Sequence, residues 1–163
     1  MDPQNYSART DYRPPAAWYR RLNRLGVPLT SLGLAPRGAV TLEVRGRKTG
    51  RPRRIPILRT SCRGHDYLVS LAGESQWVRN VWAADGRAVL RRRRTQHVRL
   101  VEVPPVDRPE IIAEYMRDAR RRSGEAASAK ATRFYFGLAP DATTDDIAGI
   151  VDRYPVFRVE YER

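Results

Sequence analysis

The chain has 163 residues, which fits one domain around a single hydrophobic core better than two full domains. Its hydrophobic fraction of 41% is ordinary, and no window approaches the ~20 consecutive apolar residues that a membrane-spanning helix needs. The formal net charge of +13 comes almost entirely from arginine, since Lys48 and Lys130 are the only lysines. Genomic base composition explains an arginine bias as readily as a nucleic-acid partner does, so the total charge assigns no function.

The few cysteines and histidines exclude several kinds of chemistry. A lone cysteine, Cys62, cannot form an internal disulfide, and His65 and His97 are too widely separated for a zinc pattern. We therefore expect no metal site and assign all three residues structural roles. Neither histidine has the neighbouring nucleophile that a hydrolytic triad requires.

The N-terminal segment divides into an arm and a helix. Residues 1–15 carry turn formers and charges without periodicity, which predicts a loose arm and no secretory signal, and hence a cytoplasmic protein. Residues 16–34 predict a helix in which Trp18, Leu22 and Leu25 form an apolar face between arginines. Such a helix either covers a pocket or makes a peripheral contact with a membrane surface.

The middle of the chain changes to the two-residue period of strands. Short apolar runs rich in β-branched residues are separated by turn residues, and the chain closes on a further alternating run. The predicted strands are Val40–Val44, Ile55–Leu58, Tyr67–Leu71, Ala88–Arg92, His97–Val103 and Pro155–Glu162. This pattern predicts an α+β fold whose barrel core spans residues 38–103 and whose closing strand lies within 155–162.

Helical spacing returns at two places. Trp77, Val81 and Ala84 lie on one face of a short helix that ends at Asp85-Gly86 and is expected to lie over the barrel mouth. Residues 106–153 predict a helical segment in three parts. It begins at a capping Asp107, continues through an alanine-rich stretch to Phe136, and ends in a short helix capped within Thr143–Asp146.

The turn between the first two strands is the strongest candidate site. It contains six cations within ten positions, together with two glycines that allow the backbone to approach a ligand. The cations are Arg45, Arg47, Lys48, Arg51, Arg53 and Arg54, and the glycines are Gly46 and Gly50. Guanidinium groups bind phosphates and carboxylates bidentately, but a solvated hairpin has the same composition, so composition leaves both interpretations open.

The segments GRKTGRPRRIPI, YLVSLAG, QWVRNVWAADGRAVL and YPVFRVE decide between them. Their order and spacing resemble the deazaflavin-dependent nitroreductase and quinone reductase family of actinobacteria, over about Gly38 to Val103 and along the C-terminal strand. The resemblance implies a split β-barrel of FMN-binding type with about six mainly antiparallel strands. It also implies an enzyme that transfers hydride from reduced coenzyme F-420 to a quinone, a nitroaromatic or an activated alkene.

The resemblance also implies roles for residues of this sequence. The basic turn would hold the phosphate and oligoglutamate tail, while the end of the third strand and the following helix would line the deazaflavin. The implied tail residues are Arg47, Lys48, Thr49 and Arg53, with Arg54, Ile55 and Pro56 beside them. The implied lining residues are Val69, Ser70, Leu71, Ala72, Gln76, Trp77, Val78, Arg79 and Asn80.

Three points about this lining stay open. Trp77 could form an apolar wall or simply pack into the core, and Asn80 needs a polar partner inside its helix. Family members carry a tyrosine and a lysine where this chain has Leu58 and Ala72, which argues against borrowing their substrates. Tyr135 is our candidate proton donor, with Tyr115, Phe134 and Phe136 as alternative pocket residues.

Two other hypotheses were retained. A split barrel that binds FMN would use the same basic turn for the phosphate, and the colour of the purified protein would distinguish it. A basic module for nucleic acid or membrane surfaces is suggested by the run Arg91–Arg94, but that run lies at an expected hairpin and lacks interleaved aromatic residues, so we expect no nucleic-acid partner. The expected partner is a small-molecule substrate, and the protein is expected to be a monomer or a homodimer.

Overall fold

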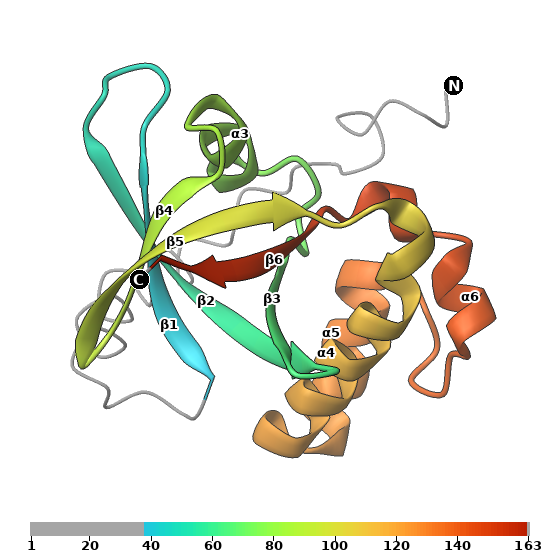
Figure 1. Cartoon of the computed structure of the whole chain (residues 1–163). Helices are drawn as coiled ribbons and strands as arrows, with labels where there is room; N and C mark the ends of the chain where they lie inside the picture. Colours follow the sequence, from blue (N-terminus) through green and yellow to red (C-terminus); the bar gives the residue numbers. More distant parts are fainter. Residues whose placement is uncertain (1–37, 163) are drawn as a thin grey trace.

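A computed structural model describes residues 38–162, which form a barrel with helices packed on its outside (Figure 1). The strands are β1 (Ala39–Arg45), β2 (Pro52–Cys62), β3 (His65–Val69), β4 (Arg87–Arg92), β5 (Arg94–Glu102) and β6 (Val156–Tyr161). The helices are α3 (Gln76–Ala83), α4 (Arg108–Ser123), α5 (Glu125–Phe136) and α6 (Thr144–Ala148), with short 3-10 turns η1 (Pro105–Asp107) and η2 (Val151–Arg153). The predicted arm 1–15 and helix 16–34 lie outside the described residues.

The six strands close into an antiparallel barrel in the order β1-β2-β3-β6-β5-β4. The pairing of β1 with β4 closes the barrel, and the C-terminal strand β6 inserts between β3 and β5. Closure removes the exposed strand edges that an open sheet would present. The predicted α+β fold with about six mainly antiparallel strands is therefore confirmed.

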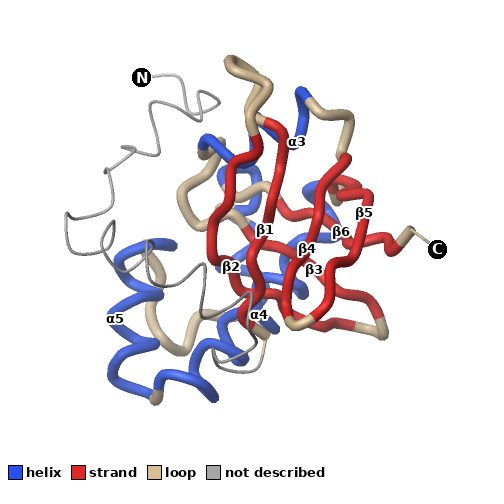
Figure 2. Tube along the Cα trace, turned by 90° about the vertical axis from the view of Figure 1, so that its left-hand side faces the viewer, coloured by secondary structure: helices blue, strands red, loops and turns tan. Residues whose placement is uncertain are grey.

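Alternation along the strands divides the apolar residues into two groups. Val40, Leu42 and Val44 of β1 point inward, where they pack with Leu68 and Phe157 in the closed interior. The alternate residues of the strands face outward. Tyr67 and Val69 of β3 belong to a second cluster with Ile112 and Tyr115 of α4. The helices therefore cover one outer side of the barrel, as Figure 2 shows for α4 and α5.

Some predicted boundaries were wrong in informative ways. β2 runs from Pro52 to Cys62, well beyond the predicted run, because its pairing with β1 and then β3 continues at both ends. β3 ends at Val69, since the Ser70 hydroxyl donates to the Gly73 carbonyl and turns the chain away from the barrel. β5 begins at Arg94, directly after the hairpin residue Arg93, whose φ of 58° marks the turn.

Of the two predicted helix caps, one forms its side-chain hydrogen bonds and the other does not. Asp107 occupies the N-cap position of α4 but makes no side-chain capping bond there. At α6 the predicted cap is confirmed, because Thr143 and Asp146 form a reciprocal capping box. Among the described residues, no helix has the length and apolar character needed to cross a membrane.

Candidate functional site

The barrel topology brings the predicted cofactor residues to one end of the molecule. β1 ends at Arg45 where β2 begins, and Val44 is paired with Ala88 at the start of β4, directly after α3. The basic turn and α3 therefore lie side by side, as the projecting β1–β2 hairpin beside α3 shows in Figure 1. Segments about thirty residues apart in the sequence form one surface.

The basic turn has a compact backbone. The Gly46 N–H donates to the Arg51 carbonyl at 2.9 Å, and the Gly50 N–H donates to the Gly46 carbonyl at 2.8 Å. Gly50 has a φ of +67°, which favours glycine. A Cβ at Gly46 would lie 3.0 Å from the Arg51 carbonyl oxygen and 3.3 Å from Cγ of Arg53. The glycines thus allow a tight loop with the Arg53 side chain laid across it.

Arg47 ties this turn to α3. Its backbone N–H and its Nη1 donate to Oδ1 of Asn80 at 3.2 and 3.0 Å, and its Nη2 donates to Oε1 of Gln76 at 3.0 Å. Asn80 is buried, so Arg47 is the partner that its amide oxygen was expected to need. The side chains of Gln76 and Asn80 are thereby turned toward the hairpin.

The remaining cations divide between those that form an ion pair and those that do not. Within residues 38–162, Arg45, Lys48, Arg51 and Arg53 form no ion pair, and all four are exposed. Arg54 differs, since its Nε lies 2.5 Å from Oε2 of Glu43. Its charge is therefore balanced locally, which weakens its prediction as a tail-binding residue.

Arg53, Arg54, Ile55 and Pro56 were all predicted to lie at the cofactor tail, but the pleat of β2 places them on two different faces. Arg53 and Ile55 pair with Val44 and Leu42 and share their inward face, whereas Arg54 and Pro56 share the outward face. Arg53 lies at the rim of the inward face, above the core. One ligand cannot contact all four side chains from one side.

Glu43 is the acidic centre of the outward face. Burial raises the pKa of its carboxyl, but hydrogen bonds from Arg91 and Arg54 outweigh burial and leave the pKa below its usual value. Arg91 of the four-arginine run also donates to Oγ1 of Thr95. These bonds give Arg91 a structural role in the barrel wall.

The loop between β3 and α3 is held by serines. Ser70 is buried, and its hydroxyl donates to the Gly73 carbonyl at 2.6 Å and lies 3.2 Å from Oγ of Ser75. Leu71 is half-buried, while Ala72 is exposed at the tip. Of the predicted lining residues in this loop, Ala72 therefore presents its side chain most fully to a ligand.

Several predicted lining residues are core residues. Val69 and Val78 are buried in the outer and inner clusters, so only their backbones could meet a ligand. Trp77 is partly buried, with its ring centroid 5.5 Å from that of Phe157, which gives it the core-packing role that had been an open alternative. Arg79 pairs with Glu74 at 3.6 Å beside the loop.

Tyr135 lies on α5, which packs mainly against α4 and is not joined to the basic turn. The ring is half-buried against the outer cluster, against which Leu58 and Leu71 also pack. Its backbone carbonyl accepts a hydrogen bond of 2.5 Å from the Tyr154 hydroxyl. The structure thus places Tyr135 on the same side of the barrel as Leu71, and its role as a proton donor stays a prediction.

One polar connection of the site was missed by sequence reasoning. Arg108 is buried, and its guanidinium donates to the carbonyls of Val103, Val151 and Tyr154 and to Oε1 of Glu102. No local signal distinguishes it from the exposed arginines of α4, because two of its acceptors, the Val151 and Tyr154 carbonyls, lie 43 and 46 residues further along the chain.

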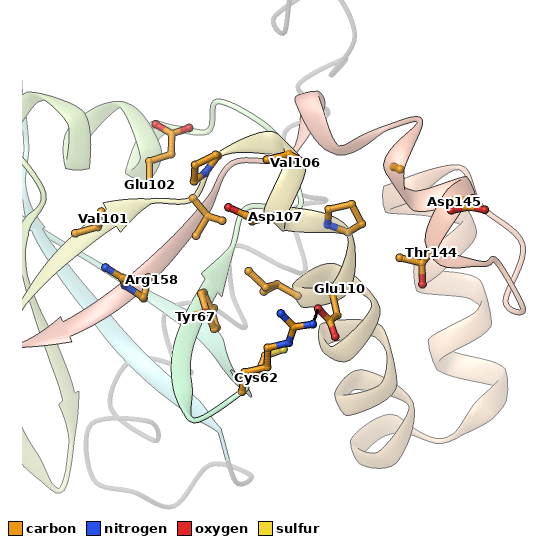
Figure 3. A pocket seen from close by; sticks show the side chains of 16 residues that line it. Cys62, Tyr67, Val101, Glu102, Val106, Asp107, Glu110, Thr144, Asp145 and Arg158 are labelled. Atoms are coloured by element: carbon orange, nitrogen blue, oxygen red, sulfur yellow. Dashed lines mark ion pairs between the residues drawn. The ribbon is translucent and has the colours of Figure 1, made fainter.

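A separate pocket of about 550 Å³ lies on the outer face of β3, β6 and β5, beside the first turn of α4 and α6 (Figure 3). Tyr67 and Arg158 form its floor, and the Arg63–Glu110 ion pair crosses its edge. Burial, with the nearby Glu110, raises the pKa of the Cys62 thiol there, so the thiol stays protonated at neutral pH. This pocket contains none of the predicted cofactor residues.

The described residues contain no group of three or more side chains suited to hold a metal ion. The barrel and the helices on one outer side define the class of protein: a six-stranded antiparallel split β-barrel.

Residues 11–131 match the F420H2-dependent quinone reductase family, and the chain belongs to this family. The resemblance found from the sequence is therefore confirmed. No curated protein matches the chain.

One of three similar solved structures supports the fold. A protein of unknown function from Agrobacterium tumefaciens superposes with a TM-score of 0.53 at 17% identity, over 92% of this chain and 59% of its own length. This chain thus spans less than two thirds of that relative. An F420-H2 dependent reductase has a TM-score of 0.40 at 20% identity, over 76% of this chain and 95% of its own. A FAD-binding protein from Mesorhizobium loti has a TM-score of 0.45 at 14% identity, over 80% and 84%.

Proposed function

We propose that this protein transfers hydride from reduced coenzyme F-420 to an electrophilic organic acceptor such as a quinone, a nitroaromatic or an activated alkene. The observation that carries the proposal is a hydrogen-bonded turn whose exposed cations form no ion pair within residues 38–162, in a chain of the F420H2-dependent quinone reductase family. Phosphate and carboxylate groups of a cofactor tail match such cations, because guanidinium and ammonium groups form charge-assisted hydrogen bonds with them.

The residues present fit the proposed cofactor. Lys48, Arg51 and Arg53 carry charges that no carboxylate neutralises within residues 38–162, and Gly46 lets the Arg53 side chain lie against the turn. We assign tail binding to these three cations and to the backbone around Thr49. When bound, the reduced deazaflavin would supply the hydride, while the chain's own task is to fix the position of the cofactor and exclude water.

The acceptor side of the site is proposed from the outer cluster. Leu58, Leu71 and Tyr135 pack against the same group of side chains, outside the barrel and beneath the helices. Leu58 and Leu71 supply apolar surface for a flat ring, and the Tyr135 hydroxyl could donate a proton to the reduced acceptor. The proposed substrate is accordingly an apolar, flat electrophile.

Binding of reduced coenzyme F-420 to the purified full chain tests this function. We expect saturable binding by calorimetry. In Lys48→Ala the dissociation constant should be about tenfold larger, because the variant loses one charge-assisted contact. Arg94→Ala is the matched control, since it removes one exposed cation at the opposite end of the barrel. No binding by the wild type, or equal weakening in both variants, would contradict the proposal.

A second measurement addresses the acceptor and the FMN alternative. Oxidation of reduced F-420 is followed with a panel of quinones, nitroaromatics and activated alkenes. A protein that is yellow as purified, releases FMN on denaturation and ignores F-420 would favour the FMN hypothesis instead.

A further inference from the structure

The Arg47 guanidinium is held by two neutral amides rather than by carboxylates. Oδ1 of Asn80 accepts from both the backbone N–H and Nη1 of Arg47, and Oε1 of Gln76 accepts from Nη2. Asn80 is only 6% exposed, whereas Arg47 and Gln76 are exposed, so the anchor runs from a buried amide out to the surface. Two side chains one turn apart on α3 thus hold both the backbone and the side chain of Arg47.

A carboxylate at either position could accept the same hydrogen bonds. In a buried position it would bind a guanidinium more strongly than an amide does, but it would also cancel the positive charge. An amide fixes the guanidinium and leaves its charge in place. The choice of amides at positions 76 and 80 therefore preserves the positive potential of the turn, at the cost of a weaker bond.

The position of Arg47 limits what else it can do. Three of its N–H groups, one of them in the backbone, are directed at α3. Its neighbours Lys48, Arg51 and Arg53 form no ion pair or side-chain hydrogen bond from their charged groups within residues 38–162. Arg47 is thus suited to anchor the turn and contribute charge, while its neighbours contact the ligand.

We infer that Gln76 and Asn80 are positioning residues that act through Arg47, rather than residues that contact the cofactor themselves. They lock the turn onto α3 while keeping its charge available to a phosphate-bearing anion. This inference rests on the proposed function for the identity of that anion, but the arrangement would serve any polyphosphate-like ligand. It reassigns two residues that had been expected to line the cofactor.

The test separates geometry from charge. Asn80→Asp keeps the size of the side chain and both acceptor bonds but adds a negative charge, whereas Asn80→Ala removes the bonds. Gln96→Glu is the matched control, because it makes the same chemical change at an exposed position near the opposite end of the barrel. Dissociation constants are measured by calorimetry for reduced coenzyme F-420 and for inorganic triphosphate, at low and high salt.

We expect Asn80→Asp to retain the thermal midpoint of the wild type but to bind both anions at least tenfold more weakly, with the deficit shrinking at high salt. The affinity of Gln96→Glu should stay within about twofold of the wild type. Its added charge lies near the opposite end of the barrel, where salt screens it from the turn. A residue with a merely structural role would tolerate Asn80→Asp. Wild-type affinity in that variant would therefore overturn the inference.

The remaining outcomes are also decisive. If Asn80→Asp fails to fold, Gln76→Glu decides, because Gln76 is exposed and its change adds the same charge beside Arg47. Wild-type affinity in Gln76→Glu would then overturn the inference. If the wild type binds triphosphate with this sensitivity but ignores F-420, the proposed function fails and the inference stands. If the wild type binds neither anion, both fail.

Discussion

The indole N–H of Trp82 on α3 donates a hydrogen bond of 2.8 Å to Oε2 of Glu102 at the end of β5. The other carboxylate oxygen of Glu102 accepts from Nη2 of Arg108, at 3.1 Å, at the start of α4. Glu102 therefore joins the helix that anchors the basic turn to the helix that covers the barrel.

Arg108 should contribute strongly to stability. Arg108→Met keeps most of the buried stem but removes the donor of the Val103 and Tyr154 carbonyls, whereas the Val151 carbonyl still accepts from the Tyr154 N–H. Each buried group left unsatisfied costs roughly 1–3 kcal/mol. We expect a loss of about 3 kcal/mol or more in the free energy of unfolding, measured by urea denaturation. Arg117→Met on the same helix is the control, and its exposed ion pair should be worth less than about 1 kcal/mol. Equal losses of unfolding free energy in the two variants would show that the buried hydrogen bonds of Arg108 contribute no more than an exposed ion pair.

Asp118 should make stability depend on acid pH. Burial raises the pKa of its carboxyl, but hydrogen bonds from Thr60 and Arg121 outweigh burial, so the folded-state pKa lies below the ordinary 3.8. A lowered folded-state pKa gives stability that is present above the unfolded value and is lost as pH falls through the folded value. Asp118→Asn should destabilise at pH 7 by about 2 kcal/mol and flatten the decline below about pH 4. An unchanged acid limb in urea titrations from pH 7 to pH 2 would contradict this, and Asp152→Asn serves as an exposed control.

Two glycines with the same backbone angle should differ in their tolerance of a side chain. Gly64 and Gly86 have φ near +78° and +77°, but a Cβ at Gly64 meets nothing within 4 Å, whereas one at Gly86 would lie 2.6 Å from the Leu100 carbonyl oxygen. Gly64→Ala should therefore cost only the left-handed strain of about 1–2 kcal/mol. Gly86→Ala should cost several kcal/mol, because backbone must move at the junction of α3 and β4. Thermal midpoints of the two variants compare the two effects, and similar shifts would refute the clash.

Tyr135 can be tested without disturbing its packing. Tyr135→Phe keeps the ring and the backbone carbonyl that accepts from Tyr154, and removes only the hydroxyl. If that hydroxyl donates the proton, kcat should fall by about a hundredfold, while F-420 affinity stays unchanged. Tyr154→Phe is the control, with loss of one hydrogen bond and an expected cost of about 1 kcal/mol in stability. An unchanged kcat in Tyr135→Phe would assign proton donation to solvent or another residue.

Periodicity predicted most of the elements because their signals are local. Alternation located β1, β4, β5 and β6, and the Thr143–Asp146 capping box located α6, since each depends on residues within a few positions of one another. The ends of β2 and β3 were mispredicted because they depend on pairing between strands and on the Ser70 hydroxyl bond. The motif order also gave the family, which the match over residues 11–131 confirms.

The sequence by itself determined the barrel class, the family and the cationic composition of the turn between β1 and β2. Only the tertiary structure decided the separate tasks of those cations: Arg54 pairs with Glu43 on the outward face, and Arg47 is bound by Asn80. The physical reason is that the charge of a side chain is a local property, whereas its partner depends on which strand face and which distant helix it meets. Arg108 shows the same limit, because its acceptors Val151 and Tyr154 lie 43 and 46 residues away and meet it only in the folded chain.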